Sequence, residues 1–146
     1  MTRFGRYRGY LRALREAGFR VHRDHILEVN YKTEASGYAG TKQLLNLRLR
    51  PDAIFAIDDL LALDAMRAAR ESGLRVPEDF GVVGVGNLPY GEHLRIPLSS
   101  VEADPTQVGK SAASMLLGMI DGKPAPGKPV LIEPTLIVRE SSCRVP

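Results

Sequence analysis

Apolar positions along the chain alternate between the spacing of helices and that of buried strands. The helical spacing predicts helices over 5–17, 35–49, 59–73 and 105–121. Short runs rich in β-branched residues predict strands over 25–31, 53–57 and 81–86, and two short strands near the C-terminus broken at Pro134. Strands that alternate with helices in this order predict an α/β fold, a three-layer parallel sheet with helices on both faces.

Sequence features near two of these predicted helices, 105–121 and 59–73, add detail to the prediction. Asp104 and Pro105 stand where the last helix begins, so we expect the Asp104 carboxylate to cap it. The stretch 87–100 has little periodicity and predicts a loop. The third helix carries a narrow stripe of small side chains, which predicts close packing against a sheet. The stripe consists of Ala62, Ala65, Met66 and Ala69.

Composition narrows the class of protein. The 146 residues are 44% hydrophobic with a net charge of +3, which suits one domain with a real core. No apolar run approaches the ~20 residues of a membrane helix, and the basic N-terminus lacks the apolar segment of a signal peptide. Cys143 is the single cysteine, which excludes a disulfide framework and a cysteine-based zinc site. We therefore expect a cytoplasmic protein that does not enter the membrane.

The positive charge is concentrated in the first 23 residues, where Glu16 alone opposes seven arginines. A basic helix of this kind can contact phosphates, lipid headgroups or an acidic partner, or it can simply present a solvated face. Both interpretations remain open at this stage. The arginines are Arg3, Arg6, Arg8, Arg12, Arg15, Arg20 and Arg23.

Two adjacent carboxylates, Asp58 and Asp59, follow the second predicted strand. Ligands of open α/β sheets bind beyond the carboxyl ends of the strands, so the position suits a site. We expect Asp59 to cap the helix and Asp58 to face the crevice as a hydrogen-bond acceptor, the alternative for Asp58 being a solvated loop acid. A catalytic carboxylate pair is disfavoured, because sequence neighbours rarely face each other across a substrate. No histidine has metal-ligand spacing to these acids, so we expect no metal site.

Three further features invite functional hypotheses. The glycines of "GVVGVGNLP" suggest a dinucleotide fingerprint, but the third glycine is absent and Pro89 opposes an immediate helix, so we reject it and expect no cofactor. Tyr31 ends the first predicted strand, where it could stack on a ligand or pack as an ordinary strand-end tyrosine. Ser141 and Ser142 suggest a nucleophile, but no histidine supports one, and we expect a surface tail.

Several stretches together resemble a known family. They are "RYRGYLRALREAGF", "SGYAGTKQLL", "RPDAIFAIDDLLALDAMRAARESGLRVPEDFGVVGVGN", "IPLSSVEADPTQVGKSAASMLLGMIDG" and "LIVRESS". Over essentially the whole chain they resemble the effector-binding domain of the lactose/galactose repressor (LacI/GalR) family of bacterial transcription regulators. The resemblance implies a type I periplasmic-binding-protein-like fold, in which an effector binds between two subdomains and thereby controls DNA binding.

The resemblance also implies how the chain is divided. Residues 1–98 correspond to an incomplete C-terminal subdomain that lacks its first strand. Residues 99–134 correspond to a crossover segment whose helix belongs to the N-terminal subdomain, and 135–146 to a return strand and tail. A missing strand leaves an unpaired sheet edge. We therefore expect either a fragment of a longer protein or another source of the lost pairing.

Site residues follow from the resemblance at matching positions only. Arg6, Tyr31 and Asp58 correspond to residues that contact a sugar or nucleoside-like effector. Gly86 stands where relatives often carry an effector-binding Asp, and Asn87 is its possible substitute. We therefore expect an altered or weak effector.

The resemblance further implies a homodimer that contacts DNA only through a helix-turn-helix not visible in this sequence. A periplasmic-type sugar-binding protein is the alternative function, since its fold is similar. An enzyme that uses Asp58 has the least support.

Overall fold

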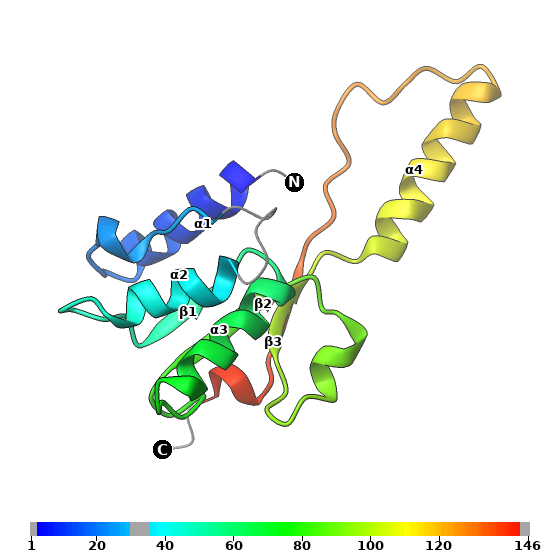
Figure 1. The fold of residues 1–146 in the computed structure, drawn as a ribbon. Helices are drawn as coiled ribbons and strands as arrows, with labels where there is room; N and C mark the ends of the chain where they lie inside the picture. The colour runs from blue at the N-terminus through cyan, green and yellow to red at the C-terminus, as the bar shows by residue number, and fades with distance from the viewer. Residues whose placement is uncertain (1–2, 30–35, 144–146) are drawn as a thin grey trace.

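The computed structural model describes residues 3–29 and 36–143 and contains one four-stranded sheet in the order β1-β2-β3-β4 (Figure 1). The first three strands pair in parallel, and β4 pairs antiparallel to β3. This parallel-dominated sheet with helices around it confirms the predicted α/β class. The strands are β1 (Ala53–Phe55), β2 (Gly81–Val85), β3 (Ser99–Glu102) and β4 (Thr135–Ile137).

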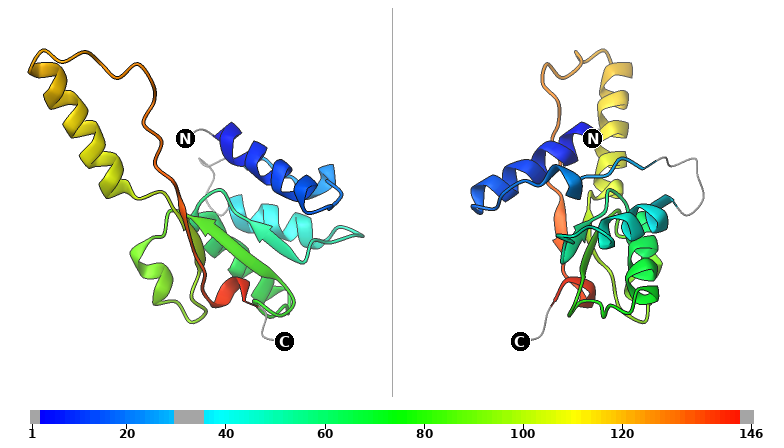
Figure 2. Two further views of the ribbon diagram at one scale, coloured as in Figure 1. Left: turned by 180° about the vertical axis from the view of Figure 1, so that it is seen from behind. Right: turned by 60° about the vertical axis from the view of Figure 1, so that its left-hand side comes forward.

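Four α-helices and three short 3-10 helices accompany the sheet in the described residues. Helices α2 and α3 pack against each other on one side of the sheet, whereas α1 lies on the opposite side (Figure 2). Helix α4 projects away from the body in every view. The helices are α1 (Arg3–Glu16), α2 (Ser36–Leu45), α3 (Asp59–Glu71), α4 (Pro105–Ile120), η1 (Arg23–His25), η2 (Pro89–Glu92) and η3 (Glu140–Ser142).

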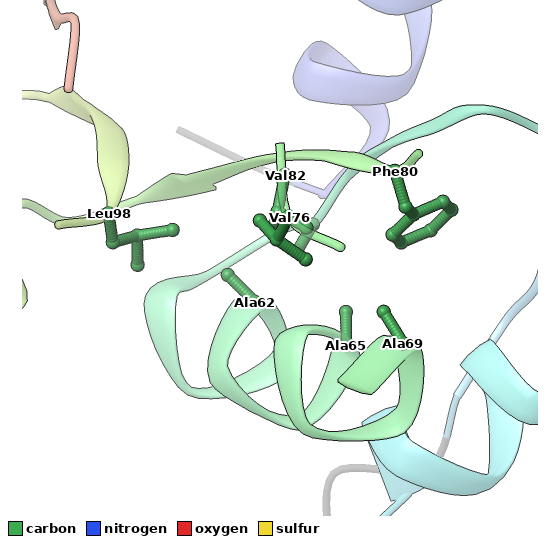
Figure 3. Close-up of a cluster of buried hydrophobic side chains, with 8 residues drawn as sticks. Ala62, Ala65, Ala69, Val76, Phe80, Val82 and Leu98 are labelled. Carbon is green, nitrogen blue, oxygen red and sulfur yellow. The ribbon is translucent and has the colours of Figure 1, made fainter. Parts of the chain in front are cut away.

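The core lies between α3 and the sheet. Ala62, Ala65 and Ala69 are fully buried and face Phe80 and Val82 across the interface (Figure 3). Alanine side chains let the helix approach the strands closely, and close packing is what stabilises an interior. The predicted small-residue stripe on this helix is therefore confirmed.

The strand predicted over 25–31 is wrong where the structure describes it. Residue 25 ends η1, and residues 26–29 join no ladder. A strand needs a neighbour to pair with, and β1 remains the end of the sheet in the described part of the chain. Near the C-terminus, residues 129–133 are likewise not a strand, so β4 is the one strand formed of the two predicted.

Strand β3 was not predicted, because it begins inside the stretch assigned to a loop. Ser99 and Ser100 are buried, and their hydroxyls are hydrogen-bonded within the protein. Ser141 is also fully buried, so its assignment to a surface tail is wrong. Its Oγ accepts from the Ser99 amide at 2.8 Å and donates to the Val82 carbonyl at 2.6 Å, which ties η3 to two strands.

Helix α4 begins as predicted, and the described part of the chain leaves it largely exposed. The Asp104 carboxylate accepts from the Gln107 amide at 2.9 Å and caps the helix. None of the helix residues is buried, and Leu116, Leu117 and Ile120 are 59%, 61% and 72% exposed. Its apolar face therefore lies open in the described structure.

Candidate functional site at the carboxyl edge of the sheet

Polar side chains gather where the three parallel strands end. Asp58 follows β1, Gly86 and Asn87 follow β2, and Glu102 ends β3. Because these strands are parallel, their carboxyl ends lie along the same edge of the sheet. This is the edge at which open α/β sheets bind ligands.

Asp58, and not Asp59, caps α3. Its backbone is extended, with φ −150°, and its Oδ1 accepts from the Leu61 amide at 2.8 Å. A carboxylate in this position satisfies one of the free amides of the first turn and interacts favourably with the helix dipole. The prediction that Asp59 is the cap is therefore wrong by one residue.

Asp59 is a buried connector, only 2% exposed. Its Oδ1 accepts from the Ser100 hydroxyl at 2.6 Å, and its Oδ2 accepts from the Leu88 amide at 2.8 Å. A Cβ built on Gly84 would lie 2.2 Å from this Oδ1, so the glycine makes room for the carboxylate. Asp59 thus joins α3 to β3 and to the loop that follows β2.

Asn87 is held in the left-handed region, with φ 50°. Its amide donates to Ser100 Oγ at 3.0 Å, and its Nδ2 donates to Glu102 Oε1 at 3.2 Å. Its Oδ1 accepts from Arg139 Nη2 at 2.8 Å, and Arg139 also donates to the Leu98 carbonyl at 2.7 Å. This network fixes the Asn87 side chain from both ends. Arg139 was not singled out as a site residue, although the "LIVRESS" motif contains it.

Arg6 reaches the same edge from α1. Its Nη1 donates to the Ile57 carbonyl at 2.5 Å, one residue before Asp58. The half-buried contact connects residues 51 positions apart. The structure therefore brings Arg6 and Asp58 to the end of β1, and joins Asp59 to Asn87 through Ser100. Tyr31 lies outside the described residues.

A cavity of about 1050 Å³ adjoins this edge but does not coincide with it. Arg6 and Ile57 line it, whereas Asp58, Gly86 and Asn87 do not. Most of its remaining wall is apolar, and burial raises the pKa of Tyr10, which faces it. Cavity and polar edge therefore share Arg6 but differ in chemistry.

The described residues contain no group of three His, Cys, Asp or Glu side chains that could hold a metal ion. No helix among them is long and apolar enough to cross a membrane.

Fold and edge together define a ligand-binding domain, and comparison with known proteins specifies its class. Residues 4–142 match the model of the periplasmic binding protein-like domain. The chain belongs to this family, as an effector-binding domain of the LacI/GalR type.

Named relatives support the same assignment. The chain is 37% identical over 140 residues to the HTH-type transcriptional repressor PurR of Pectobacterium atrosepticum, covering 96% of this chain and 41% of the relative. It superposes on a LacI-family regulatory protein from Chloroflexus aggregans with a TM-score of 0.87 at 34% identity, over 94% of this chain and 50% of that one. A transcriptional regulator CelR–cellobiose complex gives a TM-score of 0.83 at 37% identity, over 94% and 42%. The chain thus spans less than half the length of the curated relatives it matches.

Proposed function

We propose that this chain is the effector-binding part of a bacterial transcription regulator and binds a small sugar or nucleoside-like ligand. The observation that carries the proposal is the meeting of Arg6 and Asp58 at the carboxyl end of β1. A guanidinium offers several donors and a carboxylate several acceptors, which together suit a ligand rich in hydroxyl groups. The solved relative described as a complex with cellobiose supports a sugar.

Each residue of the proposed site has its own contact with the ligand. Asp58 uses Oδ1 to cap α3, so we assign its Oδ2 to a ligand hydroxyl. Arg6 uses one donor on the Ile57 carbonyl, and its other donors reach toward the ligand. Gly86 provides space for the ligand, and Asn87 contacts it by exchanging its bond to Glu102. Tyr31 stacks on one face of the ligand.

The remaining parts of the function belong to a longer protein. We propose that 1–98 forms one wall of the cleft, that 99–134 crosses to a second subdomain, and that 135–146 returns from it. The open apolar face of α4 supports this division, because such a face is stabilised by burial against a partner. The whole protein is a cytoplasmic homodimer that binds DNA through an N-terminal helix-turn-helix.

The mechanism is differential binding, without chemistry on the ligand. The effector favours one arrangement of the two subdomains, and that arrangement sets DNA affinity. The named relatives are transcription regulators, which disfavours both a periplasmic-type sugar-binding protein and an enzyme.

Isothermal titration calorimetry tests the proposal, with cellobiose as the first probe and adenosine as the second. Asp58→Asn retains a good capping residue but removes the charge, so we expect about tenfold weaker binding with an unchanged fold. Glu78→Gln removes an exposed carboxylate before β2, at the opposite edge, and serves as the matched control. The proposal fails if neither probe binds, or if both variants bind as the parent does.

A further inference from the structure

Arg139, which follows β4, directs its side chain to the loop that follows β2. Only 16% of this side chain is exposed. The Arg139 amide donates to Ser99 Oγ at 2.7 Å, and its carbonyl accepts from the same hydroxyl at 2.8 Å, so β3 fixes the backbone of Arg139. Nη1 donates to the Leu98 carbonyl at 2.7 Å, and Nη2 donates to Asn87 Oδ1 at 2.8 Å. The guanidinium is therefore held in one position beside Asn87.

These contacts determine which way the side-chain amide of Asn87 points. A guanidinium has only donors, and an ionised carboxylate has only acceptors. Oδ1 of Asn87 therefore faces Arg139, and Nδ2 faces Glu102, whose Oε1 lies 3.2 Å away. The opposite orientation would place the amide NH2 group against the guanidinium and the amide oxygen against the carboxylate. Arg139 thus makes Asn87 a hydrogen-bond donor on the side away from Arg139.

The charge of Arg139 also strengthens this donor. Nη2 lies 4.0 Å from the exposed carboxylate of Glu92, so that ion pair contributes little. The two shorter bonds of the guanidinium go to neutral oxygens, those of Leu98 and Asn87. A hydrogen bond from a cation polarises an amide, and a polarised amide donates more strongly through its N–H groups. Asn87 therefore suits a strong acceptor.

The neighbouring charges narrow the choice of ligand group. Asp58 follows β1 and Glu102 ends β3, so both carboxylates lie at this edge of the sheet and would repel an anionic ligand. An amino group on the ligand would leave the Nδ2 donor of Asn87 without an acceptor. A hydroxyl group both donates and accepts, so it would bind either orientation of the amide and would not require Arg139. A neutral carbonyl oxygen is the group that matches the fixed donor.

We propose that Arg139 is a positioning residue of the effector site, which fixes the Asn87 amide with Nδ2 toward the ligand. The site thereby selects an effector that presents a neutral carbonyl oxygen at the end of β2. This inference rests on the proposed function and deepens it, since it names the ligand group that Asn87 contacts. Arg139 acts through Asn87 and does not itself touch the ligand.

Isothermal titration calorimetry of the full chain with two nucleosides tests the inference, with cellobiose as the third ligand. Inosine carries a carbonyl oxygen at the position where adenosine carries an amino group. We expect the parent chain to bind inosine about tenfold more tightly than adenosine, because the amino group would meet the Nδ2 donor. The quantity compared between variants is this ratio of two affinities. A loss of stability that weakens both nucleosides alike leaves the ratio unchanged.

Four variants separate positioning from a structural role. Arg139→Met removes the donors and lets the Asn87 amide turn over, so the preference should fall to within about threefold. Arg139→Lys retains a charged donor and should retain most of the preference. Asn87→Asp tolerates the same left-handed backbone but offers only acceptors, so it should bind adenosine more tightly than inosine. Arg95→Met removes an exposed arginine between η2 and β3 and is the control that should keep the parental ratio.

Each possible result bears on the inference. An unchanged ratio in Asn87→Asp would overturn it, even if Arg139→Met does not fold. An unchanged ratio in a folded Arg139→Met would assign Arg139 a structural role alone and would also overturn it. Equal affinity of the parent for the two nucleosides, or binding of cellobiose alone, would overturn the inference and leave the proposed function standing. Absence of binding by all three ligands would overturn the proposed function and this inference with it.

Discussion

Removing the Asp59 carboxylate is expected to destabilise the fold severely, although the sequence predicted for Asp59 only the role of a helix cap. Asp59→Ala leaves the Ser100 hydroxyl and the Leu88 amide without their acceptor. An orphaned buried donor costs about 1–3 kcal/mol, and two of them therefore cost about 2–6 kcal/mol. That is a large fraction of the ~5–15 kcal/mol by which a domain of this size is stable.

Equilibrium urea unfolding, followed by far-UV circular dichroism, measures this loss. Glu133→Ala removes an exposed acid from the segment after α4 and should change the free energy of unfolding by less than about 0.5 kcal/mol. A double-mutant cycle with Ser100→Ala isolates the direct bond, and we expect a coupling of about 1–2 kcal/mol. A loss below about 1 kcal/mol for Asp59→Ala, or a coupling near zero, would refute the connector role.

Three further outcomes can be checked in the same way. Gly84→Ala should lower the free energy of unfolding by about 1–3 kcal/mol, because the new Cβ would lie 2.2 Å from an Asp59 oxygen. An unchanged midpoint of urea unfolding would show that the carboxylate can move. Ser141→Ala should lose about 1–3 kcal/mol by orphaning the buried Ser99 amide, and unchanged stability would mean that another group replaces the hydroxyl. Hydrogen bonds from the side chain and then the main chain of Arg75 hold the pKa of Asp79 well below its usual range. The interaction of ionised Asp79 with Arg75 therefore stabilises the folded state fully above the unfolded pKa of about 3.9. This stabilisation is lost as the pH falls toward the lower pKa of the folded state. Asp79→Asn should therefore flatten the acid side of the stability profile, and an unaltered slope would count against the pair.

Features encoded by neighbouring residues could be predicted from the sequence. The alanine stripe of α3 and the Asp104 cap of α4 depend on contacts within a few residues or on simple periodicity, and both are present. The α/β class followed from the alternation of apolar runs. These signals are local, so one sequence is enough to read them.

Features that depend on distant partners could not be predicted. Strand β3 contains serines whose pattern resembles a loop. Their polar groups are satisfied by distant residues, namely Ser141 and Arg139 for Ser99 and Asp59 for Ser100. Asp58 and Asp59 have different roles because the Ser100 hydroxyl donates a hydrogen bond to Asp59, which lies 41 positions away in the sequence. Residues 26–29 have the apolar pattern of a strand but belong to none of the strands formed by the described part of the chain. The hydrogen bond from Arg6 to the Ile57 carbonyl spans 51 residues and was not predicted, since the family resemblance concerned only a contact between Arg6 and an effector.

Because α4 projects from the body of the molecule, a small rotation of this helix about its first residue displaces its far end by a larger distance. Its 16 residues span about 24 Å at about 1.5 Å each, so a rotation of about 10° at the root moves the tip by about 4 Å. The root is Asp104, whose left-handed backbone (φ 43°) sets the direction of the helix and whose carboxylate clamps its first turn. Glu102, which Asn87 contacts, stands two residues before this pivot. A small change in backbone direction at the carboxyl edge would therefore produce a much larger displacement of Ile120. A distance measurement between a spin label at Ile120 and a second label on the sheet would detect this displacement.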